Sequence, residues 1–199
     1  MHITLTDGSS FFVPRDLLDS LELTEGAECS ERDLERLRHA HLLHLAREKA
    51  VELLARSEHS RFLLARKLLA REFPEGVIND CLCELEERGY LDDRRFAEQW
   101  VSSRIRRRPE GSVALIAGLQ QRGVDARLAR QVVDGFEEAF PQEFERALER
   151  AGDRILRRDG VGAEELREKL SRRGFRASEI SLYIERVSEK LSGGANPEK

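Results

Sequence analysis

The apolar residues of the chain recur at a fixed spacing of 51 residues from about residue 60 onward. Four sets of apolar positions keep this register: Leu64, Leu115 and Leu166; Leu68, Leu119 and Leu170; Phe73, Val124 and Phe175; and Leu82, Val133 and Ile184. A period shared by three blocks is typical of a repeat protein, in which each block is one supersecondary unit. Such tandem units form long surfaces, which bind other macromolecules rather than enclose a small substrate.

Within each block the apolar residues are spaced as they are on amphipathic helices. In the third block Leu166 and Leu170 lie four residues apart, and Ile180, Ile184 and Val187 follow at steps of four and three. Three short helices that each carry one apolar stripe can bury those stripes only by packing against one another. The pattern therefore predicts an all-α fold, an elongated tandem array of three three-helix repeats.

Caps and breakers indicate where the predicted helices begin and end. Ser30 is suited to an N-cap, Pro74 separates two helices, and Gly89 ends a helix as a left-handed C-cap does. Gly123 ends another helix, and Gly174 separates the last two. The predicted helices are 30–56, 60–72, 75–88, 94–107, 112–123, 125–139, 141–158, 163–173 and 177–191. The three repeats accordingly span residues 30–91, 92–140 and 141–191.

Residues 1–29 depart from the helical pattern. Apolar and polar residues alternate from His2 to Val13 around the turn-forming pair Asp7-Gly8, which predicts a small β-hairpin. Because an isolated hairpin is marginally stable, we expect it to rest on a helix. A short helical piece is predicted within residues 14–28, and residues 192–199 have the composition of a disordered tail.

The chain of 199 residues is 36% charged, with a net charge of −4, so its overall charge does not indicate nucleic-acid binding. The charges are unevenly distributed, however. Residues 1–45 carry a net charge of −5, whereas residues 94–130 hold nine arginines against three acids, a net charge of +6. Such asymmetry indicates a local anionic partner.

The arginines of the basic stretch are the candidate partner-binding residues. The strongest candidates stand at a predicted helix end beside Pro109: Arg104, Arg106, Arg107 and Arg108. Guanidinium groups there suit an acidic protein surface or phosphates; the alternative is a solvated face that stabilises a helix C-terminus. Weaker candidates are Arg94, Arg95, Arg127 and Arg130. Arg71, Arg122 and Arg173 recur with the repeat and are expected to serve the fold, and Phe96 and Trp100 are expected in the core.

The sequence contains no P-loop and no glycine-rich dinucleotide-binding motif. His41 and His44 have the spacing of a metal pair, but no matching Cys or His completes a site, so a solvated face is favoured. The pair Asp92-Asp93 is interpreted as a helix cap with a first-turn acid rather than as catalytic carboxylates. We therefore expect neither an enzyme nor a metal or cofactor.

Three cysteines make no even disulfide set, which predicts reduced thiols in a cytoplasmic protein. No apolar run reaches the roughly 18 residues of a membrane span. We expect a monomer that has no contact with membranes.

The segment Gly89 to Ala97, which reads G-Y-L-D-D-R-R-F-A, resembles the most recognisable segment of the RecX family, regulators of the bacterial recombinase RecA. The matching residues are Gly89, Leu91, Asp92, Asp93, Phe96 and Ala97. The triplets Arg122-Gly123-Val124 and Arg173-Gly174-Phe175 resemble later repeats of the family, and the hairpin resembles an extension that some members carry. The chain departs from the family at Leu63, where a Glu is common.

The resemblance implies a non-catalytic modulator that needs no cofactor. It implies binding to the RecA filament on DNA, across adjacent RecA subunits, with inhibition of RecA ATPase and recombinase activity. The alternative is an autonomous DNA-binding helical module, because three-helix units resemble helix-turn-helix folds. The arginine-rich stretch 94–130 would then follow the backbone of single- or double-stranded DNA.

Overall fold

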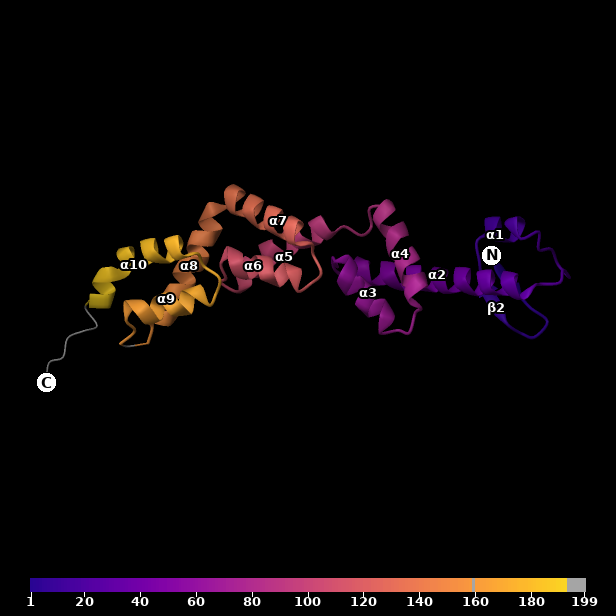
Figure 1. Cartoon of the computed structure of the whole chain (residues 1–199), viewed down its shortest axis with the longest axis horizontal. Helices are drawn as coiled ribbons and strands as arrows, with labels where there is room; N and C mark the ends of the chain where they lie inside the picture. Colours follow the sequence, from indigo (N-terminus) through magenta and orange to yellow (C-terminus); the bar gives the residue numbers. More distant parts are fainter. Residues whose placement is uncertain (159, 193–199) are drawn as a thin grey trace. The chain divides into compact units, whose positions relative to one another are not determined.

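The computed structural model describes residues 1–158 and 160–192, with side chains as far as Ser188. The described chain is helical apart from one N-terminal pair of strands (Figure 1), which confirms the predicted fold class. It forms two compact units, one from Met1 to Asp92 and one that begins at Asp93. Asp159 and residues 193–199, which make up most of the predicted disordered tail, lie outside the described residues.

The predicted hairpin is present and rests on a helix. Strands β1 (His2–Thr4) and β2 (Ser10–Phe12) pair antiparallel, with Ile3 opposite Phe11. The short helix α1 (Arg15–Ser20) follows, and the hairpin and α1 enclose a small core with the long helix α2 (Glu31–Arg56). The backbone N–H of Phe12 donates a hydrogen bond to Nδ1 of His41 at 2.9 Å. His41 therefore anchors the hairpin, and the expectation of a solvated face is wrong for this residue.

The second half of α2 packs with α3 (Arg61–Leu69) and α4 (Glu75–Glu87) around a second core. Ser30 caps α2 by accepting the N–H of Asp33, and Ser60 caps α3 by accepting the N–H of Leu63. A serine hydroxyl in this position satisfies a backbone donor that the helix itself leaves unpaired. Leu64 and Leu68 of α3 are fully buried.

The second unit repeats this arrangement twice. Helices α5 (Asp93–Arg107), α6 (Ser112–Gln120) and α7 (Ala126–Ala139) form one set. Helices α8 (Pro141–Leu156), α9 (Ala163–Ser171) and α10 (Ala177–Ser192) form the next. The buried leucines recur at the predicted register: Leu64, Leu115 and Leu166 are all fully buried, and so are Leu68, Leu119 and Leu170.

The turn after the middle helix of each set also recurs, and it ends the helices earlier than predicted. The predicted helix 60–72 ends at Leu69, because Glu72 adopts the left-handed conformation with φ of 64°. Gly123 and Gly174, which stand 51 and 102 residues later, have φ of 80°. In each turn this residue donates its N–H to the carbonyl three residues before it, at 2.9, 2.9 and 2.8 Å. The turn is therefore a left-handed C-cap in all three repeats.

Two of these repeats meet through their backbones inside the second unit. The N–H of Gly111, at the start of α6, donates to the carbonyl of Arg173 at 2.9 Å, and the N–H of Val113 donates to that of Gly174 at 3.2 Å. A Cβ on Gly111 would lie 2.3 Å from the Gly174 oxygen, a distance that no side chain tolerates. Glycine at both positions thus lets the second and third repeats pack as one unit.

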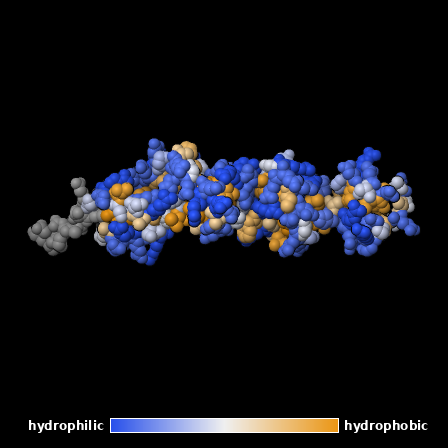
Figure 2. Space-filling view, turned by 45° about the horizontal axis from the view of Figure 1, so that its top comes forward, coloured by the Kyte–Doolittle hydropathy of each residue, from blue (hydrophilic) through white to orange (hydrophobic). Residues whose placement is uncertain are grey.

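Figure 2 shows that hydrophilic residues cover most of the visible face, with hydrophobic residues exposed in scattered patches. Four of the large apolar side chains that remain exposed on helices are Phe62, Leu69, Val113 and Leu182. Single exposed apolar residues are ordinary on protein surfaces, so only those beside a groove call for an explanation.

Candidate partner-binding surface

Arg104 is occupied by an internal ion pair. Its Nε and Nη2 donate to the two carboxylate oxygens of Glu110 at 2.7 and 2.8 Å. The two side chains are only 28% and 20% exposed. This paired geometry is the strong form of an arginine–carboxylate contact. Arg104 therefore braces the turn between α5 and α6, which weakens the case for it as a partner-binding residue.

Trp100 lies between two of the arginines. The guanidinium carbons of Arg104 and Arg122 stand 5.6 and 4.7 Å from its ring, within the range of cation–π contacts. Arg122 also donates to the carbonyl of Gly118 at 2.7 Å, which is a structural role. The expectation of a core position holds for Phe96, which is buried, but Trp100 remains partly exposed.

Arg106, Arg107 and Arg108 form the exposed arginine cluster at the end of α5. Among the described residues, no side chain forms a hydrogen bond or ion pair with any of the three guanidinium groups. Pro109 next to them is buried and fixes the chain direction after the helix. Three adjacent cations therefore face solvent from a firmly held helix end.

The helix end itself is stabilised by another arginine. Arg150 of α8 donates to the carbonyl of Ile105 at 3.0 Å and to that of Arg106 at 3.2 Å. A cation at a helix C-terminus satisfies carbonyl groups that have no partner within the helix. Because Arg150 supplies this contact, the exposed arginine cluster is not required for it. Sequence reasoning missed Arg150, since nothing local to residue 150 marks this contact across 44 residues.

Arg94, Arg95, Arg127 and Arg130 are exposed at the other end of this helical set, where α5 and α7 begin. Arg94 donates to the side chain of Gln131 at 3.2 Å, which brings the two helix starts together. At 1.5 Å per residue, Arg94 and Arg107 lie about 20 Å apart along α5. The basic stretch therefore makes two separate groups rather than one patch.

A carboxylate caps the second of these helix starts. Asp125 accepts the N–H groups of Arg127 and Leu128 at 2.8 and 3.2 Å. These backbone hydrogen bonds, from Leu128 and then Arg127, hold the pKa of Asp125 below its usual value. Asp125 is thus the N-cap of α7, and it orients the first turn of this helix, which carries Arg127.

The segment from Gly89 to Ala97 closes α4 and starts α5. Gly89 has a left-handed φ of 71°, and its N–H donates to the carbonyl of Glu86 at 2.9 Å. Leu91, Phe96 and Ala97 are buried, and α5 begins at Asp93. The motif therefore serves the backbone turn and the packing around it, rather than presenting a reactive group.

Within the described part of the chain, no three His, Cys, Asp or Glu side chains gather into a possible metal site. None of the described helices is long and apolar enough to cross a bilayer. Cys29, Cys81 and Cys83 are free thiols, and burial raises the pKa of Cys81 to about 11. A buried thiol with so high a pKa is a packing residue rather than a nucleophile.

Two family models match the chain. The model for the first three-helix domain of RecX matches residues 46–85, and the model for the second three-helix domain of RecX matches residues 92–133. The second match begins at Asp92, inside the motif described above, and continues through α5, α6 and the first half of α7.

Curated relatives carry the name regulatory protein RecX. The protein from Halorhodospira halophila is 36% identical over 67% of this chain and 83% of the relative. The protein from Thermobifida fusca is 38% identical over 73% of this chain and 78% of the relative. A crystal structure of regulatory protein RecX shares the fold, with a TM-score of 0.74, 19% identity and coverage of 91% of this chain and 92% of the other. The chain belongs to the RecX family.

Proposed function

We propose that the chain is a non-enzymatic regulator that binds RecA filaments on DNA and lowers their ATPase and recombinase activity. Family membership supports this function, because the relatives are named regulatory proteins. The structural observation that carries it is the exposed arginine cluster, whose three guanidinium groups have no partner among the described residues. A regulator of this kind acts in the cytoplasm as a monomer, as the sequence predicts.

The chemistry of the cluster fits an anionic partner. A guanidinium group pairs with a carboxylate through two parallel hydrogen bonds, and it stays charged at any physiological pH. Three such groups on consecutive residues point in different directions around a helix end, so they can meet carboxylates or phosphates on more than one side. The Arg150 contact holds that helix end in place, which limits the entropy lost on binding.

Charge reversal of the cluster tests the proposal. The variant combines Arg106→Glu, Arg107→Glu and Arg108→Glu, and its binding to RecA filaments on single-stranded DNA is measured by co-sedimentation. We expect binding to weaken by about 100-fold, because opposed like charges cost several kcal/mol.

The matched control uses the end of α8, one repeat further along the chain. Arg154, Arg157 and Arg158 are likewise exposed, and their replacement by Glu changes the net charge by the same amount. The proposal requires this control to bind nearly as well as the original chain. Equal losses in both variants would show that total charge, and not the cluster, governs binding.

The second candidate function is direct DNA binding, which the two exposed basic groups near opposite ends of α5 favour. If the three guanidinium groups of the exposed arginine cluster each bind a phosphate of single-stranded DNA, a plot of log affinity against log salt concentration should have a slope of about −2. Fluorescence anisotropy of a labelled oligonucleotide without RecA measures that slope. Affinity that stays constant from low to high salt would exclude this alternative.

A further inference from the structure

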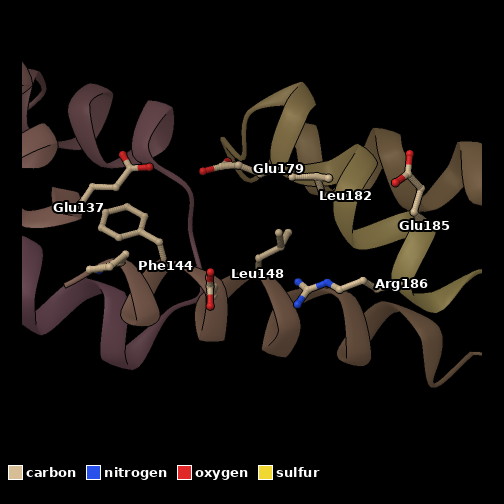
Figure 3. A pocket seen from close by; sticks show the side chains of 9 residues that line it. Glu137, Phe144, Leu148, Glu179, Leu182, Glu185 and Arg186 are labelled. Atoms are coloured by element: carbon tan, nitrogen blue, oxygen red, sulfur yellow. The ribbon is translucent and has the colours of Figure 1, made fainter.

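A groove of about 700 Å³ opens between α8 and α10, beside the end of α7. Its lining is mostly apolar, with Phe144, Leu148 and Leu182 as the large side chains. Figure 3 shows Leu148 pointing toward Leu182, and the ring of Phe144 beside Glu137. Phe144 and Leu148 are buried at the base of the groove, whereas Leu182 is 62% exposed at its edge. The groove is thus an apolar channel with an open side.

The corresponding helices of the preceding repeat pack more closely than α8 and α10 do. There α5 packs along α7, whereas α8 and α10 touch at fewer positions. One of the contacts between α8 and α10 is the ring of Tyr183 against Gly152, where a Cβ would lie 2.3 Å from the ring. At the register of Leu182 the preceding repeat carries Gln131, which receives the hydrogen bond from Arg94. The third repeat therefore places an exposed leucine where its neighbour has a polar surface residue.

Aromatic side chains extend the apolar surface beyond the groove. Phe136 lies 5.0 Å from Phe140 and 6.3 Å from Phe144, measured between ring centroids. Phe140, at the junction of α7 and α8, is 52% exposed. Exposed apolar residues that adjoin a groove and one another mark an interaction site more strongly than scattered ones do.

The rim of the groove is acidic. Four carboxylates line it, namely Glu137, Glu145, Glu179 and Glu185, and one cation, Arg186. Glu137 is paired with Arg176 at 3.0 Å, whereas the other three carboxylates form no ion pair with any described residue. Arg186 is itself paired with Glu149 at 3.5 Å. Burial raises the pKa of Glu137, and the carboxylates of Glu179 and Asp134 raise it further, while Arg176 lowers it. The rim thus presents more negative charge than the described residues neutralise.

We propose that this groove is a docking site for a basic amphipathic helix of a partner protein, with apolar side chains in the groove and Lys or Arg against the carboxylates. A channel between two helices has the shape that a third helix fills, by the same packing that joins helices within the repeats. The acidic rim selects the charge of the occupant. Residues 193–199 of the chain contain no large apolar side chain, so they lack the chemistry of this occupant.

The docking site is separate from the exposed arginine cluster and opposite to it in charge, so it does not rest on RecA binding. The probe is a synthetic helix-forming peptide of about 18 residues, long enough to hold a helix. It carries leucine along one face and lysine on both flanks, and fluorescence anisotropy measures its binding. Two control peptides have the same composition in scrambled order, or glutamate in place of lysine. We expect the probe to bind and both controls to bind at least about tenfold more weakly.

Two variants of the chain locate the binding. Leu182→Gln installs the residue of the preceding repeat and should weaken probe binding by about tenfold. Glu145→Lys combined with Glu185→Lys should weaken it by about 30-fold, because like charges then oppose each other. The matched controls are Leu69→Gln, and Glu87→Lys combined with Glu98→Lys, all at exposed positions of helices outside the groove. These controls should bind the probe as the original chain does.

Three results would overturn the proposal. The first is a scrambled or acidic peptide that binds as tightly as the probe. The second is a Leu182→Gln variant that binds the probe with unchanged affinity. The third is a dimer of the chain in analytical ultracentrifugation that Leu182→Gln abolishes. The last result would assign the groove to a second copy of the chain. The circular-dichroism helix signal of every variant is measured as well. An unchanged signal shows that a loss of binding is not caused by unfolding.

Discussion

The second and third helical repeats touch through their backbones, whereas the first repeat has side chains at the matching positions. Gly111 and Gly174 make the close contact in the second unit. In the first repeat the residues at these registers are Ser60 and Glu72. A Cβ at either glycine would lie 2.3 Å from a backbone atom of the other repeat, so this contact within the second unit depends on glycine at both positions. The apolar period therefore specifies each three-helix set, and the two glycines allow the second and third sets to pack closely.

The largest effect is expected at Gly174. A Cβ there meets the backbone nitrogen of Ala114 at 2.3 Å, and the residue also has a left-handed φ of 80°. The free-energy costs of a left-handed alanine and of overpacking add together, so Gly174→Ala should lower the free energy of unfolding by about 2–4 kcal/mol. Urea unfolding followed by circular dichroism measures the loss.

Gly89→Ala is the matched control for this substitution. Gly89 also has a left-handed φ, of 71°, but its Cβ would meet nothing within 4 Å. Only the backbone strain remains, so the cost should be about 1–2 kcal/mol. Equal costs at the two glycines would contradict the close contact between the second and third repeats.

A smaller effect is expected when the N-cap residues of α3 and α6 are exchanged. Gly111→Ser gives the second repeat the residue of the first, and it should cost about 1–3 kcal/mol by overpacking, even though serine is a good N-cap. Ser60→Gly in the first repeat should cost only a few tenths of a kcal/mol. A Gly111→Ser variant that is as stable as the original chain would show that the second unit relaxes around the added side chain.

The turn at Glu72 in the first repeat should become more stable with glycine, the residue that the second and third repeats carry at this register. Glu72 holds a left-handed φ of 64° that glycine adopts without steric cost. The side chain is exposed, so Glu72→Gly should raise the free energy of unfolding by about 0.5–1 kcal/mol, the relief of strain less the entropy of a glycine. A rise in the urea midpoint of the first unit checks this, and a fall would show that Glu72 makes a stabilising contact.

The smallest effect concerns pH. The backbone hydrogen bonds that hold the pKa of Asp125 below its usual value stabilise the folded state only while the carboxylate is ionised. The contribution is present above the unfolded-state pKa, near 3.8, and disappears as the pH falls through the lower folded-state pKa. Asp125→Asn keeps a capping oxygen without a charge, so the stability of this variant should vary less than that of the original chain as the pH falls below the unfolded-state pKa. An identical pH profile for both proteins would remove Asp125 from this account.

Much of the fold was predictable because it depends on local signals. The starts of α3, α6 and α9 recur at the 51-residue period, and the buried leucines follow from the same apolar period. The ends of α3, α6 and α9 were predicted two to three residues late, because each helix ends three residues before the left-handed residue of its turn. In the first repeat that residue is Glu72, and no glycine marks it. The docking of the hairpin through His41 depends on a contact across 29 residues that composition does not encode.

The candidate sites were predictable only in part. The arginines of α5 stand out as a run of charge, but the sequence does not show that Glu110 occupies Arg104 or that Arg150 replaces the others at the helix end. The groove lies between α8 and α10, which touch at fewer positions than α5 and α7 do. This arrangement is set by packing between helices more than 30 residues apart, so only the exposed Leu182, at the register of Gln131, hints at it in the sequence.

The most direct test of the account is a titration of RecA ATPase activity. The chain is added in increasing amounts to RecA on single-stranded DNA, and the rate of ATP hydrolysis is followed. The account predicts inhibition at well below one chain per RecA, because a regulator held on a filament affects subunits beyond the one it contacts. A rate that remains unchanged at every ratio would contradict the proposed function.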